Sequence, residues 1–177
     1  AVAPGANGRL AVAHADGTTR VWSPSVVSDS DSLGFTQDSA FTPFDDAPDA
    51  PLASVHFASE DALVVGGENN GALAMWSLPP PNDDMTSSPE HVHTLTFAPS
   101  GDIFNVVNSA APGARLVLVS NLKKQAVYAV HYAETASRGF DYVAEFSTTM
   151  PVLSFAATRE AADDAADAAG PGGALQL

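Results

Sequence analysis

Cysteine is absent from this chain of 177 residues, and positively charged residues are few. Without cysteine the chain has no disulfides, no thiolate nucleophile and no cysteine-ligated metal, which is more typical of a reducing compartment. No apolar run approaches the roughly 20 residues that a membrane helix needs. The sequence also has no secretory signal and no Asn-X-Ser/Thr sequon. We therefore expect neither a disulfide framework nor a membrane partner.

The shortage of positive charge is severe, with 7 Lys and Arg against 21 Asp and Glu and a net charge of −14. The acidic residues gather in three segments, 23–50, 79–91 and 159 onward. Acidic side chains in connecting segments mainly keep loops solvated, although an acidic tail could also attract a basic partner. Because a phosphate backbone would be repelled, we do not expect this region to contact RNA directly.

A hairpin that ends in tryptophan occurs twice, at residues 10–22 and 64–76. In each copy the turn glycine, Gly17 or Gly71, stands five residues before the tryptophan, Trp22 or Trp76. Asp-Gly or Asn-Gly between apolar runs predicts a tight turn with positive φ. A recurring hairpin closed by an aromatic residue is typical of a WD40-type β-propeller blade. We expect both tryptophans to pack in blade cores, with ligand stacking as the alternative.

Alternating and β-branched runs predict further strands, and Pro, Gly, Asn and Asp mark the turns between them. The expected strands beyond the first hairpin cover 52–57, 62–66, 72–78, 91–97, 103–107, 115–120, 126–132, 140–146 and 150–156. Residues 23–50, rich in Ser, Asp and Pro, are predicted to form a long, mobile acidic insertion. Residues 157–172 are predicted to be a disordered acidic and Ala-rich loop, and 173–177 the start of the next strand.

The fold predicted from this pattern is all-β, a partial WD40-type β-propeller over residues 1–156 with about three blades of a probable seven. A propeller closes only with about four to eight blades. Together with a first residue that is not methionine, this predicts that the chain is part of a longer protein.

Metal and catalytic motifs are weak. The segment Asp29–Gly34 begins like a calcium loop, but Leu33 and Ala40 occupy positions where oxygen ligands are needed. His91 and His93 are two residues apart and should share one face of a strand, yet no third zinc ligand is nearby. The sequence has no nucleophile elbow, no phosphate-binding glycine loop and no evident carboxylate pair. We therefore expect no enzyme activity, no metal and no cofactor.

Lys123 and Lys124 form the only adjacent basic pair. They fall on a predicted turn, where they are either solvated or in contact with an acidic peptide or a phosphate group. They are the candidate partner contact of the sequence.

Two segments, 116–131 and 141–155, have a distinctive sequence, beginning Leu-Val-Leu-Val-Ser-Asn and Asp-Tyr-Val-Ala-Glu-Phe. In this order they resemble the WD40 domain of the enhancer-of-mRNA-decapping scaffold family, called VARICOSE in plants. The preceding Thr94–Phe97 and Asp102–Phe104 fit the same family at the right distance. The resemblance is specific over about residues 91–156 and generic for WD40 repeats upstream.

The resemblance implies a non-catalytic scaffold of cytoplasmic processing bodies, in which the propeller is a protein-interaction platform. Its expected partners are the decapping catalytic subunit and its activator, and self-association would use regions absent from this chain. The family supplies no catalytic residues. Two other functions stay open: a WD40 adaptor of another pathway, such as a ubiquitin-ligase or chromatin subunit, and a hydrolase or lyase on a propeller.

Overall fold

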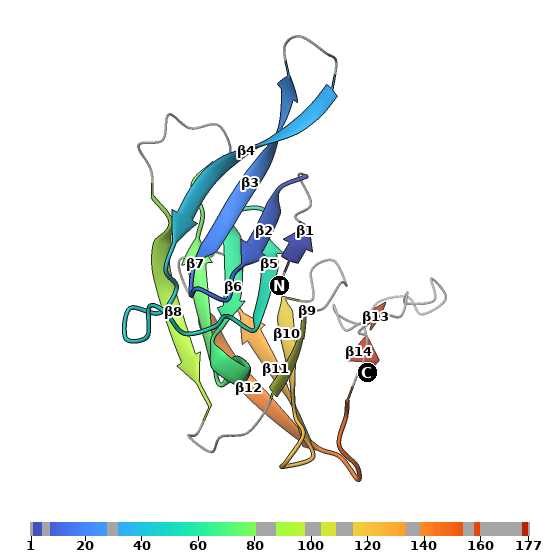
Figure 1. The fold of residues 1–177 in the computed structure, drawn as a ribbon. Coiled ribbons are helices and arrows are strands. Elements are labelled where there is room, and N and C mark those ends of the chain that lie inside the picture. The colour runs from blue at the N-terminus through green and yellow to red at the C-terminus, as the bar shows by residue number, and fades with distance from the viewer. Residues whose placement is uncertain are drawn as a thin grey trace, which may run out of the picture.

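The computed structural model describes residues 2–4, 8–27, 32–80, 88–97, 104–108, 115–133, 139–153, 158–159 and 175–176. Within them lie three four-stranded antiparallel sheets and one two-stranded pair (Figure 1). The first sheet contains β1 (Val2–Pro4), β2 (Leu10–Ala13), β3 (Thr19–Val27) and β4 (Ser32–Phe41). The second contains β5 (Ser54–Ser59), β6 (Ala62–Gly66), β7 (Ala72–Ser77) and β8 (Glu90–Thr96). The third contains β9 (Phe104–Asn108), β10 (Leu116–Asn121), β11 (Ala126–Tyr132) and β12 (Phe140–Ser147).

The three sheets are consecutive blades arranged around their first strands. In each sheet the strands follow one another in chain order. The first strands lie close together, β1 beside β5 and β5 beside β9. The sheets therefore stack face to face and fan outward from their first strands, as propeller blades do. Among the described residues, no helix is long and apolar enough to cross a membrane.

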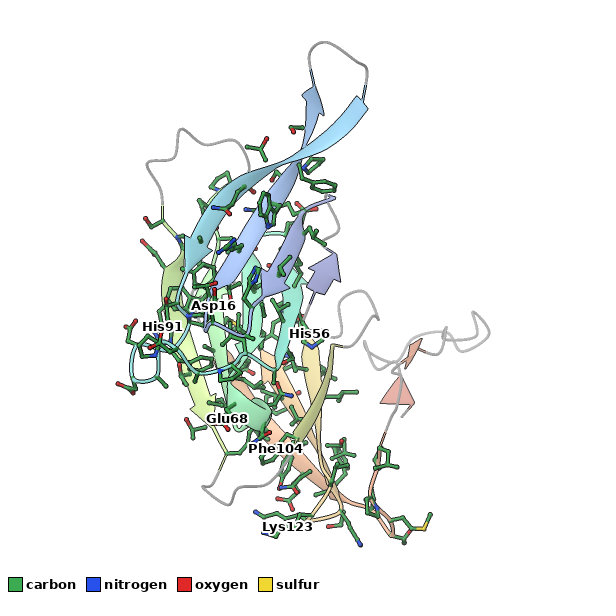
Figure 2. The ribbon with its side chains drawn as sticks, in the orientation of Figure 1. Asp16, His56, Glu68, His91, Phe104 and Lys123 are labelled. Carbon is green, nitrogen blue, oxygen red and sulfur yellow. The ribbon has the colours of Figure 1, made fainter. Side chains whose placement is uncertain are left out.

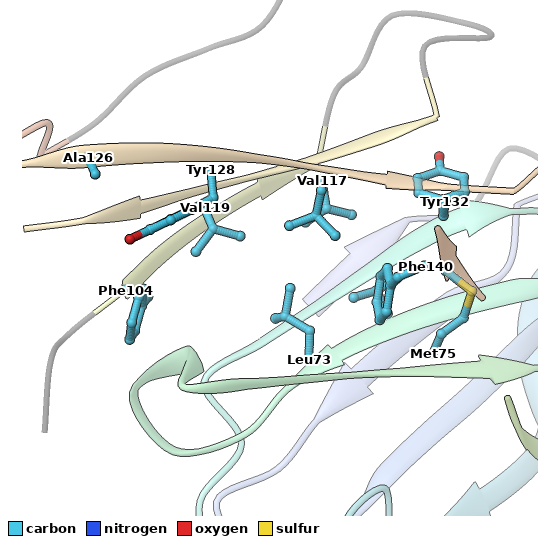
Figure 3. Packing of buried hydrophobic residues seen from close by; sticks show 11 residues of the cluster. Leu73, Met75, Phe104, Val117, Val119, Ala126, Tyr128, Tyr132 and Phe140 are labelled. Atoms are coloured by element: carbon cyan, nitrogen blue, oxygen red, sulfur yellow. The ribbon is translucent and has the colours of Figure 1, made fainter. Parts of the chain in front are cut away.

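Two apolar clusters hold neighbouring blades together. Between the first and second blades, small and β-branched residues such as Ala11 and Val21 meet Val55, Leu63 and Val65. Between the second and third blades, the cluster is larger and richer in aromatic residues (Figure 3); it contains Val64, Leu73, Met75, Phe104, Val117, Val119, Ala126, Tyr128, Val130, Tyr132 and Phe140. The middle blade contributes to both clusters, so β6 is buried along its whole length. This explains its continuous apolar sequence.

The prediction of a mobile insertion over 23–50 is wrong for residues 23–27 and 32–41, which belong to β3 and β4. Beyond Ser23, β3 and β4 pair only with each other and form a ribbon that projects from the first blade (Figure 1). Among the described residues no third strand pairs with this ribbon, so it has no need for one apolar face. Its sequence therefore shows no alternation and resembles a loop. Residues 42–50 do form a connection, which leads to the second blade.

The strand predicted over 150–156 is also wrong where the structure describes it, since residues 150–153 have no strand pairing. Pro151 lacks the N–H that a ladder needs. Thr148 instead closes a turn, with its hydroxyl donating to the carbonyl of Met150 at 2.7 Å. Residues 154–156 and most of the predicted disordered loop, 157–172, lie outside the described residues. Within that loop Thr158–Arg159 form β13, which pairs with β14 at Leu175–Gln176.

Candidate functional site

A groove of about 730 Å³ lies between the first and second blades. One wall is the connection 43–50, and the other is the turn 67–71 with the exposed side of β8. Phe44 of the first wall packs closely against Gly67 of the second. The lining residues are Pro43, Phe44, Asp45, Asp46, Ala47, Ala50, Gly67, Glu68, Asn69, Gly71, Ala72, Trp76, His91, Thr94, Thr96, Phe97 and Phe104. We call this hollow the interblade groove.

Aromatic rings form much of the lining of the interblade groove. Trp76 packs against Phe41 of the first blade, with ring centroids 4.6 Å apart. At the other end, Phe97 stacks on Phe104 at 4.9 Å. Trp76 is 9% exposed, and its indole Nε1 is buried without an acceptor among the described residues. The groove thus has apolar walls, and one of its lining residues carries a buried donor without a described acceptor.

A second, smaller hollow of about 270 Å³ adjoins the interblade groove between the second and third blades. Both hollows share Thr96, Phe97 and Phe104 in their walls. Lys124 and Glu145 line the smaller one. Figure 2 shows Glu68, Phe104 and Lys123 at the same end of the blades. The two hollows therefore form one surface across the turns at this end of the propeller.

Asn70 fixes the turn between β6 and β7 that borders this surface. The hydroxyl of Ser54 donates to Asn70 Oδ1 at 2.6 Å, and Asn70 Nδ2 donates to the carbonyl of Phe104 at 2.9 Å. Both bonds are buried, so they hold the turn against β5 on one side and against the third blade on the other. A buried amide with both ends paired is a rigid link between blades.

The two sequence-predicted lysines lie in the turn between β10 and β11, where both are exposed. The side chain of Asn121 orders this turn, because its Oδ1 accepts the backbone N–H of Lys123 at 3.0 Å and that of Lys124 at 2.9 Å. The lysines thus stand at the end of the blades that carries the interblade groove. Sequence reasoning found this turn but not the groove beside it.

Gly17 and Gly71, which the sequence makes equivalent, differ in the structure. Gly17 has a φ of +82° and is buried under the connection 42–53. Gly71 has a φ of −67°, so the expected positive φ is wrong there. Asn69 and Asn70 take the left-handed conformation in its place, with φ of 54° and 56°. Asparagine tolerates this conformation better than most other residues, which moves the turn one or two residues upstream.

Trp22 and Trp76 do occupy corresponding places, each in the third strand of its blade beside a β-bulge. The third blade has the same bulge between β11 and β12, and there Tyr132 of β11 takes the place of tryptophan. Tyr132 packs into the cluster with the second blade and donates its hydroxyl to the carbonyl of Ala58 at 2.9 Å. Sequence reasoning missed this third marker because the residue is tyrosine.

His91 and His93 do not share a face, contrary to the prediction. Trp76 pairs with His91 and Met75 with His93, so Val92 is an extra residue in β8. A bulge of this kind reverses the alternation of side chains. His91 therefore packs on Trp76 at 5.3 Å toward the first blade, whereas the Nδ1 of His93 accepts the N–H of Phe140 at 3.1 Å.

No three His, Asp or Glu side chains among the described residues come close enough to hold a metal ion. Asp29 and Asp31 of the calcium-like segment lie outside those residues.

Outside the groove, His131 Nδ1 lies 2.6 Å from Asp141 Oδ1, and this hydrogen bond is the main reason that the pKa of Asp141 lies below its usual range.

Burial of His56 in β5 predicts that the stability of the protein depends on pH. Its Nε2 is buried without a described partner, and burial lowers the pKa of its ring from the ordinary 6.5. On acidification the unfolded chain takes up this proton first, so stability falls as pH drops below 6.5 and levels off below the folded pKa. We expect His56→Gln to flatten this part of the curve of unfolding free energy against pH. His91→Gln, at an exposed position, is the control, and an unchanged slope in His56→Gln would contradict the assignment.

Comparison with known proteins supports the fold and leaves the family open. No protein-family model matches the sequence, and no curated protein sequence is similar to it. Among solved structures, the β-propeller domain of Cps50 (Swd1) from Myceliophteria thermophila matches with a TM-score of 0.53 at 11% identity, over 81% of this chain and 39% of that one. The periplasmic gluconolactonase PpgL of Pseudomonas aeruginosa matches with a TM-score of 0.53 at 13% identity, over 83% of this chain and 39% of that one. A Lactobacillus plantarum protein gives 0.51 at 13%, over 87% of this chain and 42% of that one.

These likenesses confirm an all-β, partial β-propeller fold. The chain spans about two fifths of the length of the structures it matches. One of these neighbours is an enzyme by its title and another is a propeller domain, so the fold alone does not decide between catalysis and binding. A total of seven blades stays a prediction.

Proposed function

We propose that this chain is part of a non-catalytic scaffold that assembles the mRNA decapping machinery in cytoplasmic processing bodies. The observation that carries the proposal is the resemblance of segments 116–131 and 141–155 to the decapping-scaffold family. In the structure the first segment forms β10 and β11 with their turn, and the second begins within β12 beside them. The resemblance therefore falls on adjoining strands of one blade.

The shape of the molecule supports a platform role. Stacked blades hold their turns on a rigid framework, and turns on such a framework commonly carry binding function. Here the turn with Lys123 and Lys124 lies near the hollows that cross the blade edges. A platform of this kind raises the local concentration of partners without changing them chemically. The decapping activator and catalytic subunit are the partners we propose.

Co-precipitation from a nuclease-treated cytoplasmic extract tests the proposal, with the full-length protein as bait. We expect recovery of both the decapping catalytic subunit and its activator. Substituting both turn lysines, Lys123→Glu with Lys124→Glu, should reduce recovery of the activator several-fold, because a charge reversal at a binding rim mainly weakens association. Lys123→Arg with Lys124→Arg preserves the charge and is the matched control.

Two outcomes would reject the decapping role. The unaltered protein could recover neither decapping partner although it is soluble and folded. It could instead recover subunits of a ubiquitin ligase or of chromatin, which would favour the adaptor of another pathway. A loss of activator that is equal in the charge-reversed and arginine variants would assign the effect to the turn's structure and remove the lysines from the proposal.

A further inference from the structure

The rim of the interblade groove has one sign of charge. Asp45 and Asp46 are exposed on one wall and Glu68 on the other, and no lining residue is Lys or Arg. The remaining polar residues of the rim include Thr94, Thr96 and His91. Since low-dielectric walls on both sides concentrate the field of such charges, the groove attracts cations and repels phosphate.

The interior of the same groove is apolar and has the size of a ligand site. Binding pockets commonly measure about 300–1,000 Å³, and this groove has about 730 Å³. Phe44, Trp76 and Phe97 supply wide ring surfaces to its walls. Trp76 is nine-tenths buried, yet its indole N–H has no acceptor among the described residues. A buried donor without an acceptor is uncommon and calls for a partner.

We propose that the interblade groove binds an extended segment of a partner protein in which Lys or Arg flanks an aliphatic or aromatic residue. The apolar side chain would enter between the rings, and the basic head would remain at the carboxylate rim. Lys and Arg suit this place because their aliphatic stems cover apolar surface while the charge stays in water. A small shift of Trp76 would allow a main-chain carbonyl of the segment to accept its N–H.

The negative charge of the rim favours a basic segment over a second copy of this chain or a nucleic acid. A second copy of the chain carries a net charge of −14, so its acidic surface would meet an acidic rim. A nucleic acid is disfavoured for the same reason. The inference rests on the platform role proposed above but not on the decapping pathway, since any partner with such a segment would fit.

The test is a selection of short random peptides displayed on phage, with the intact protein as bait. We expect the selected peptides to carry net positive charge and to place Lys or Arg beside Leu, Ile, Phe or Trp. No selection above background, or selection of acidic peptides, would overturn the proposal. Because the assay contains no decapping protein, its failure is distinguishable from failure of the decapping role.

Direct binding then locates the site. A fluorescein-labelled selected peptide is titrated by anisotropy into the protein with Asp45→Asn, Asp46→Asn and Glu68→Gln combined. We expect an affinity about tenfold weaker and a smaller dependence on salt, as for other rim charges. The control combines Asp49→Asn, Glu60→Gln and Glu90→Gln, which removes the same charge at exposed positions that do not line the groove.

A steric variant separates the groove from the general field of the protein. Ala47 is exposed and lines the groove, so Ala47→Trp should fill it without changing charge or disturbing a buried contact. We expect at least a tenfold loss of peptide affinity. Undiminished binding to this variant, or equal losses in the groove and control charge variants, would place the peptide elsewhere and refute the site.

Discussion

Gly17→Ala is expected to destabilise the protein by about 2–5 kcal/mol. A non-glycine residue in the left-handed conformation costs roughly 1–2 kcal/mol, and Gly17 has a φ of +82°. An added Cβ would also lie only 1.8 Å from the carbonyl oxygen of Pro48. The connection 42–53 would have to move away, and overpacking of this kind typically costs a further 1–3 kcal/mol. Urea unfolding followed by tryptophan fluorescence measures the change.

The matched control is Gly71→Ala. The φ of Gly71 is −67°, and its added Cβ would meet nothing closer than the carbonyl oxygen of Glu68 at 3.6 Å. Alanine is unstrained there, so the variant should be as stable as the parent or more stable by about 0.4–1 kcal/mol. Equal destabilisation by the two substitutions would show that both turns have the conformation that the sequence alone suggested. Because Gly17 supports the wall of the interblade groove, Gly17→Ala should also weaken peptide binding.

The sequence predicts best those strands that neighbouring blades cover. The sequence predicts the same bounds as the structure for β6 (62–66) and β11 (126–132). Burial on both faces of a strand leaves a dense apolar signal in its sequence. The ribbon of β3 and β4 was missed for the opposite reason. Among the described residues its outer part pairs only within the ribbon, so local composition carries no record of the pairing.

The sequence does not predict the pairing register between the third and fourth strands of each blade. Every blade has a β-bulge beside the aromatic residue of its third strand, and nothing in the local sequence marks the extra residue. The bulge sends His91 and His93 to different faces, although their spacing predicts one face. It also gives Tyr132 the place that Trp22 and Trp76 hold in the other blades. A single inserted residue reverses every assignment beyond it.

The interblade groove was missed because its parts are distant in sequence. Phe44 and Asp45 belong to a segment that composition marks as a solvated loop, and Glu68 belongs to a turn recognised only for its Asn-Gly. Phe97 is the last residue of the strand predicted over 91–97. Only the stacking of one blade on the next brings these residues to one hollow. Local patterns predict blades, whereas the surface between blades depends on their packing.

Asp38→Ala is expected to cost about 3–5 kcal/mol, the range for removing one partner of a buried ion pair. Arg9 is 1% exposed, and its Nη2 lies 3.2 Å from Asp38 Oδ2. The guanidinium also donates to the carbonyls of Glu60 and Pro79 in the second blade. Without Asp38 a buried positive charge at the boundary between blades would lose this carboxylate partner. Urea unfolding measures the loss of stability.

Asp141→Ala is the control, because Asp141 is the extra residue of the third blade's bulge as Asp38 is of the first. Its side chain is 43% exposed, and its ion-pair partner is a histidine that is charged only when protonated, so we expect a small change in stability. Arg9→Met combined with Asp38→Ala removes both charges and should recover part of the loss, since the desolvation cost disappears with them. The double variant could instead be clearly less stable than Asp38→Ala alone, as expected when two substitutions act independently. That result would show that Arg9 stabilises the blades through its bonds to the second blade's carbonyls and not through Asp38.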